Sequence, residues 1–168
     1  MKIDKRNPAH WLALALLGAH AVAALVLRPL MRGQRVRAPK RLVILYGHKL
    51  SGNLLAMHRY WRAHAMSEFD MVFLTMDQRY FRKLKASGIA ATLATRPATI
   101  TLLARAHAII SDHGLHSMTI LVGRSSIRFF DVWHGFGFKG HDLDDFRVLR
   151  RYDEIWVGSP MQAGFYVN

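Results

Sequence analysis

A histidine and a lysine share one glycine-rich turn that follows an apolar run. The stretch RFFDVWHGFGFKGHD spans residues 128–142 and contains His134, Gly135, Gly137 and Lys139. A neutral imidazole there can take a proton from a hydroxyl nucleophile, and an ammonium group can offset charge on a phosphoryl group. Glycines let backbone N–H groups approach an anion closely. This turn is therefore the candidate catalytic site, and its alternative is a tight turn with a solvated lysine.

A second loop, GHKLSGN (47–53), combines basic side chains with a predicted helix start. His48 and Lys49 follow an apolar run, and Asn53 is the predicted N-cap of the next helix. The first turn of a helix favours negative charge, so this loop could bind a phosphate group of a substrate. An ordinary turn between a strand and a helix is an equally weighted alternative.

A third loop, SDHGLH (111–116), places a carboxylate beside histidines. The loop offers Asp112, His113 and His116, and we expect Asp112 to orient a neighbouring histidine. A metal site is disfavoured, because histidine ligands normally recur on a regular element and the sequence offers no obvious third ligand. We predict neither a bound metal nor a permanently bound cofactor.

Apolar runs precede these loops and predict the scaffold that positions them. Six runs are typical of buried strands: residues 41–47, 70–76, 89–95 (the weakest), 108–114, 127–135 and 153–159. Helices are predicted to start near Asn53, Asp77, Pro97 and Pro160, with a short one at 143–151 and an ambiguous run at 118–123.

Strands that alternate with helices predict a Rossmann-like α/β fold, with a parallel sheet and helices on both faces. Ligands of such sheets bind beyond the carboxyl ends of the strands. The residues expected at that edge are His48, Asp112, His113, His134 and Ser159.

The chain is strongly basic, with a formal net charge of +13, and it has no cysteine. The charge is compatible with nucleic acid, an anionic membrane surface or phosphorylated substrates. Absence of cysteine excludes disulfides and thiolate nucleophiles. Much of the charge flanks one apolar segment, and no nucleic-acid recognition motif is present, so we expect no nucleic-acid partner.

That apolar segment, Trp11 to Leu27, predicts a hydrophobic membrane-anchor helix at the short limit of the roughly 17–25 residues needed. The expected organisation is a basic N-terminus (1–10), the anchor (11–27), a basic linker (28–40) and a Rossmann-like lobe (41–168). The heavier basic flank follows the anchor, which predicts a cell-membrane protein with its bulk on the cytoplasmic side. The alternatives are a cleaved signal peptide and a helix lying among the lipid headgroups.

Four segments carry a family resemblance. They are VILYGHKLSGNLLAMHRYW, ARAHAIISDHG, RFFDVWHGFGFKG and YDEIWVGSPMQAGFY, and between them they span about residues 41–168. In this order they resemble the amino-terminal half of the CDP-glycerol glycerophosphotransferases, the teichoic-acid primases and polymerases. The Trp-His-Gly turn with its following lysine is the most specific of the four.

The resemblance implies the N-terminal lobe of a GT-B-like fold and a CDP-glycerol-type nucleotide donor as substrate. It implies that His134 acts as the base, that Lys139 assists, and that the acceptor is lipid-linked or a polyol phosphate. Donor-binding residues of the family lie mostly in a second lobe. We therefore expect this chain to be a fragment that is inactive alone, or one completed by a partner chain. The alternatives are a GT-B-like transferase of a sugar from a sugar nucleotide and a basic nucleic-acid-binding module.

Overall fold

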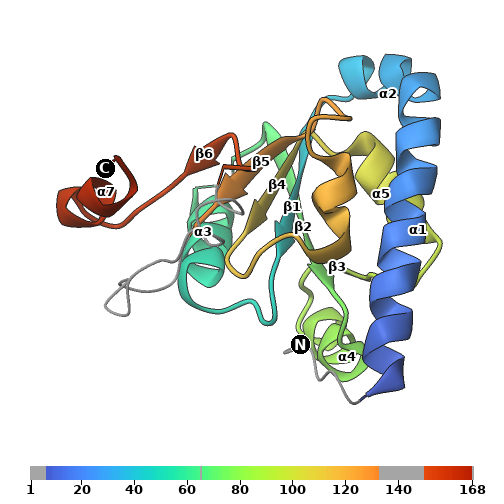
Figure 1. Cartoon of the computed structure of the whole chain (residues 1–168), viewed down its shortest axis with the longest axis horizontal. Helices are drawn as coiled ribbons and strands as arrows, with labels where there is room; N and C mark the ends of the chain where they lie inside the picture. Colours follow the sequence, from blue (N-terminus) through green and yellow to red (C-terminus); the bar gives the residue numbers. More distant parts are fainter. Residues whose placement is uncertain (1–6, 65, 133–149, 168) are drawn as a thin grey trace.

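A computed structural model describes residues 7–64, 66–132 and 150–167, and its centre is one six-stranded parallel sheet (Figure 1). The strands lie in the order β3-β2-β1-β4-β5-β6. They are β1 (Arg41–Tyr46), β2 (Phe69–Thr75), β3 (Ala91–Leu93), β4 (Ala108–Ser111), β5 (Arg128–Asp131) and β6 (Glu154–Ile155). The arrangement is Rossmann-like, and the strand order reverses between β1 and β4.

Helices connect these strands and precede them. They are α1 (Pro8–Leu30), α2 (Arg32–Arg37), α3 (Gly52–Ala63), α4 (Gln78–Ala86), α5 (Ala98–Arg105), the 3₁₀ helix η1 (His116–Leu121) and α7 (Pro160–Val167). The ambiguous run at 118–123 therefore lies mostly in η1. The predicted parallel α/β fold is confirmed, and all six predicted strands are present, although several are shorter than expected. Residues 133–135 of the fifth predicted strand and 143–149 of the predicted short helix lie outside the described residues.

Two helix starts test the predicted caps. Asp77 caps α4 as expected, because its Oδ1 accepts a hydrogen bond of 2.9 Å from the backbone N–H of Tyr80. The cap predicted at Asn53 is wrong. Helix α3 begins at Gly52 with Ser51 as its N-cap, and Asn53 Nδ2 instead donates to the carbonyl oxygen of Val132 over 3.1 Å. Asn53 thus ties the start of α3 to the end of β5.

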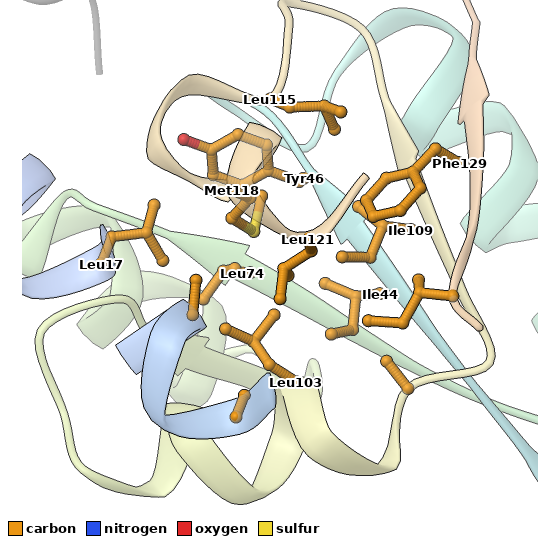
Figure 2. Close-up of a cluster of buried hydrophobic side chains, with 14 of the residues drawn as sticks. Leu17, Ile44, Tyr46, Leu74, Leu103, Ile109, Leu115, Met118, Leu121 and Phe129 are labelled. Carbon is orange, nitrogen blue, oxygen red and sulfur yellow. The ribbon is translucent and has the colours of Figure 1, made fainter. Parts of the chain in front are cut away.

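Apolar clusters cover both faces of the sheet. One face packs against α1, α5 and η1, and Figure 2 shows Leu17, Leu103 and Leu121 from these three helices in one cluster with Ile44 of β1. The other face packs against α3 and α4 through a smaller cluster. Because successive side chains of a strand point to opposite faces, each strand contributes alternately to the two clusters.

Helix α1 is an apolar N-terminal helix that lies along the domain (Figure 1). Its length and composition suit a membrane span, but its inner side is buried against α5 and η1. Polar contacts hold it there. His20 Nδ1 lies 2.9 Å from the carbonyl oxygen of Ala94, and Ser117 Oγ donates to the carbonyl oxygen of Leu14 over 2.8 Å.

Residues 28–40, expected to be a linker, are largely helical, since α1 continues to Leu30 and α2 follows. Arg28 is buried rather than solvated. Its Nη1 donates to the carbonyl oxygens of Ala104 (2.9 Å) and Ala106 (2.8 Å), and its Nη2 donates to Ser126 Oγ (2.9 Å). Carbonyl groups at the end of a helix lack partners within the helix, so this guanidinium caps the end of α5.

Candidate functional site

The carboxyl ends of β1 and β4 bring three histidines together where the strand order reverses. His48 follows β1, and His113 and His116 follow β4. The ring centroids of His48 and His113 are 4.4 Å apart, and those of His48 and His116 are 6.2 Å apart. We call these histidines, with Asp112 and Tyr46, the switch-point cluster. Its position is the one at which open parallel sheets bind ligands.

Asp112 lies against one of these histidines, which is the kind of pairing that the sequence predicted. Its Oδ1 lies 2.7 Å from His113 Nδ1, and the carboxylate is almost completely buried. Gly47 makes room for it, because a Cβ at this position would overlap Asp112 Oδ1 and come within 2.9 Å of Leu54 Cδ1. The short contact places the Nδ1 side of the His113 ring against a buried carboxylate.

His116 has a left-handed backbone conformation, with φ of 48°, which is uncommon for a residue other than glycine. Its Nδ1 lies 2.9 Å from the hydroxyl of Tyr46, and the two rings meet edge to face. Burial lowers the pKa of His116, and the nearby His113 lowers it further. The ring is therefore a neutral hydrogen-bonding group at pH 7 rather than a cation.

A row of buried polar groups underlies the cluster. Tyr46, Ser111 and Asp131 occupy matching positions at the ends of β1, β4 and β5, on the face that packs against α1 and η1. Ser111 Oγ lies 2.9 Å from the hydroxyl of Tyr152. Burial raises the pKa of both tyrosines, so both phenols are neutral. Three adjacent strands thus end in hydrogen-bonding side chains instead of apolar ones.

Asp131 is the carboxyl group of this row, and its pKa is strongly shifted. Burial, with a smaller contribution from the Asp112 carboxylate, raises its pKa to about 7. Its Oδ1 is buried and has no hydrogen-bond partner among the described residues. A carboxyl group with a pKa near neutrality at the ligand-binding edge of a sheet is suited to give or take a proton.

The remaining predicted site residues lie at different distances from the switch-point cluster along the same edge of the sheet. Lys49 is exposed beside His48, and Asn53 lies at the start of α3. Ser159 follows β6, which is separated from β4 by β5, so it belongs to the outer part of the edge. Four predicted residues lie outside the described residues: His134, Gly135, Gly137 and Lys139.

Sequence reasoning missed the polar residues just inside the strands. These are Tyr46, Ser111 and Asp131, and Tyr152, which contacts Ser111, was missed as well. A signal was available, because in each of the runs LVILY, AIIS and FFD a polar or amphipathic residue follows apolar ones at the end of the strand. The burial of Tyr152 had no such signal, since this residue lies in an irregular segment whose path only the fold determines.

Within the described ranges, no group of three or more histidine, aspartate or glutamate side chains is arranged to hold a metal ion. Comparison of the chain with protein-family models, with curated proteins and with solved structures finds no match in any of the three.

Proposed function

We propose that the chain is one lobe of a membrane-associated phosphotransferase. It would transfer a polyol phosphate from a CDP-glycerol-type donor to a hydroxyl group of a lipid-linked or polyol-phosphate acceptor. The observation that carries this proposal is the convergence of His48, Asp112 and His113 at the point where the strand order reverses. The resemblance of four sequence segments to the CDP-glycerol glycerophosphotransferases supplies the substrate class.

In the proposed reaction the acceptor hydroxyl oxygen attacks the β-phosphorus of the donor. The phosphoanhydride bond breaks, CMP leaves, and the hydroxyl proton passes to His134. Lys139 offsets the charge that develops on the phosphoryl oxygens. His48 and His113 donate hydrogen bonds to phosphate oxygens, and the start of α3 adds a favourable dipole beside them.

Membrane association is the second part of the proposal. The outer side of α1 presents Trp11, Leu12, Val22, Val26 and Leu30, all of them exposed. Crossing a bilayer would break the contacts that His20 and Arg28 make with the domain. We therefore propose that α1 lies in the plane of the membrane with this outer side in the lipid, and that the sheet lies on the cytoplasmic side.

Histidine NMR of the whole chain tests the phosphotransferase proposal. We expect glycerol 3-phosphate and CDP-glycerol to shift the ring resonances of His48, His113 and His116. His64, exposed at the far end of α3, serves as the internal control and should not move. The His48→Ala variant should lower the ligand affinity that the resonances of the other two rings report at least tenfold.

Two other outcomes are informative. A response to UDP-glucose without one to CDP-glycerol would replace the proposal with a sugar-nucleotide transferase. No response of the three rings to any of these ligands, in a chain that is folded by circular dichroism, would remove the phosphate-binding role of the cluster.

A further inference from the structure

The opposite edge of the sheet holds a recess that no residue of the switch-point cluster lines. It has a volume of about 1030 Å³ and lies beside α3, where the strands begin. Val43, Ile110 and Phe130 form its floor, on the sheet face opposite α1. Trp61 and Trp156 line its sides. The floor is therefore apolar and the walls carry large aromatic rings.

Five arginines line the same recess: Arg28, Arg32, Arg35, Arg41 and Arg128. No aspartate or glutamate is found among the described residues that line it. We call the recess the arginine groove. Such a concentration of one charge around an apolar floor is unfavourable unless a counter-ion is present, so the groove is complementary to a negatively charged ligand.

Two of these cations are already compensated. Arg128 pairs with Glu154 over 2.6 Å, and Arg28 donates to the carbonyl groups at the end of α5. Arg32, Arg35 and Arg41 form no ion pair with any described residue. Arg35 makes one long contact of 3.4 Å from Nη1 to Ser126 Oγ, while its Nε is buried without a partner in the described part of the chain.

The nearby arginines also lower the pKa of His107, which lines the groove. Burial lowers its pKa most, and Arg35, Arg28 and Arg41 lower it further. Its Nδ1 accepts a hydrogen bond of 3.1 Å from the backbone N–H of Leu42. The imidazole is therefore neutral, and the positive potential of the groove comes from guanidinium groups that stay charged at neutral pH.

We propose that the arginine groove binds a phospholipid-like amphiphile, with its phosphate on Arg32, Arg35 and Arg41 and its alkyl chain on the floor. Neither half of such a ligand is sufficient alone. An inorganic anion would leave the apolar floor wet, and a neutral hydrocarbon would leave the cations uncompensated. The volume is just above the roughly 300–1,000 Å³ typical of small-molecule sites, which is enough for an extended alkyl chain. Arginine forms paired hydrogen bonds with phosphate oxygens.

Tryptophan fluorescence of the whole chain tests this proposal, since two of the three tryptophans that the structure describes line the groove. The probe is dodecyl phosphate below its micelle concentration. We expect a saturable change in emission. Arg35→Gln and Arg41→Gln should each lower the affinity for dodecyl phosphate at least fivefold. The matched control is Arg82→Gln, an exposed arginine on α4 outside the groove, which should leave the affinity unchanged. Thermal melting of each variant checks that it is folded.

Comparison ligands decide between this site and its rivals. Equal affinity for inorganic phosphate, or for dodecyl maltoside, would overturn the proposal. The groove would then recognise only the phosphate group or only the alkyl chain. Tighter binding of a single-stranded oligonucleotide with the same arginine dependence would make it a nucleic-acid site. A dimer in gel filtration that Trp156→Ala dissociates would show that a second copy covers the groove. Absence of any saturable change would also refute it.

Discussion

At the residue scale, Asp131 shows how the fold changes the chemistry of one carboxyl group. In the unfolded chain its pKa would be near 3.9, whereas burial beside Asp112 raises it to about 7. Tyr152 and Tyr46 also belong to its surroundings, and both are neutral there. The folded protein therefore binds this proton more tightly than the unfolded chain does.

This shift predicts a pH dependence of stability. Between about pH 4 and pH 7 the folded state keeps the Asp131 proton that the unfolded chain has lost, so stability falls as pH rises, by at most about 1.4 kcal/mol per unit. Asp131→Asn should remove this slope. Urea unfolding of both proteins at pH 5 and pH 8 measures it, and the difference cancels the contribution of histidines. Parallel pH profiles for the two proteins would show that the pKa is not raised.

Gly47 gives a second prediction at this scale. A methyl group on residue 47 would overlap the Asp112 carboxylate, so Gly47→Ala should displace it and lower stability by about 1–3 kcal/mol. The His113 resonance should shift as well, because its partner moves. Gly33→Ala is the control, since nothing lies within 4 Å of a Cβ there and alanine favours its helix. A Gly47→Ala protein with normal stability and an unshifted His113 resonance would contradict this account.

At the element scale, α1 is held to the domain by side chains that reach backbone carbonyl groups of other elements. Arg28 caps α5, and His20 contacts the segment after β3. In the other direction, Ser117 of η1 donates a hydrogen bond to a backbone carbonyl of α1. Apolar residues such as Leu17 fill the space between these contacts (Figure 2). The helix is thus a layer of the domain, covering one face of the sheet (Figure 1).

Arg28→Leu should lower the free energy of unfolding by about 2–4 kcal/mol. The substitution leaves the carbonyl oxygens of Ala104 and Ala106 buried without their donor, and each such loss costs about 1–3 kcal/mol. Arg37→Leu, at an exposed position in α2 outside the arginine groove, is the matched control and should change stability by less than about 0.5 kcal/mol. Urea denaturation measures both, and equal effects would show that the cap contributes nothing.

At the scale of the whole molecule, the two edges of the sheet have different character. The carboxyl edge gathers histidines and carboxyl groups, while the amino edge carries the arginine groove. Helix α1 runs beside the sheet with its outer side free to meet a lipid surface (Figure 1). An orientation with α1 in the membrane plane leaves both edges accessible to ligands.

The exposed side of α1 predicts binding to anionic vesicles. Val22→Glu with Val26→Glu should reduce co-sedimentation with phosphatidylglycerol vesicles at least tenfold, because two charges would enter the lipid. Both valines are exposed, so the melting temperature should change little. Val22→Ala with Val26→Ala controls for the altered positions and should retain most of the binding. Undiminished sedimentation of the glutamate variant would exclude this side of α1 as the contact.

Local patterns in the sequence determined much of this protein. Apolar runs that alternate with capped helices were sufficient to predict a parallel α/β sheet, and the residues after each run were sufficient to predict His48, Asp112 and His113 at one edge. These signals are local, because strand burial and helix caps depend on neighbouring residues.

Tertiary structure alone decided the rest. Which strands are adjacent is a property of long-range packing, so the pairing of His48 with His113 and the row ending in Asp131 could not be read from spacing. The same reason explains α1, whose apolar composition fits a membrane equally well, and whose inner side meets the domain only because α5 and η1 present a matching apolar surface. The pKa of Asp131 and the arginine groove follow from burial, which residues far apart in the chain create together.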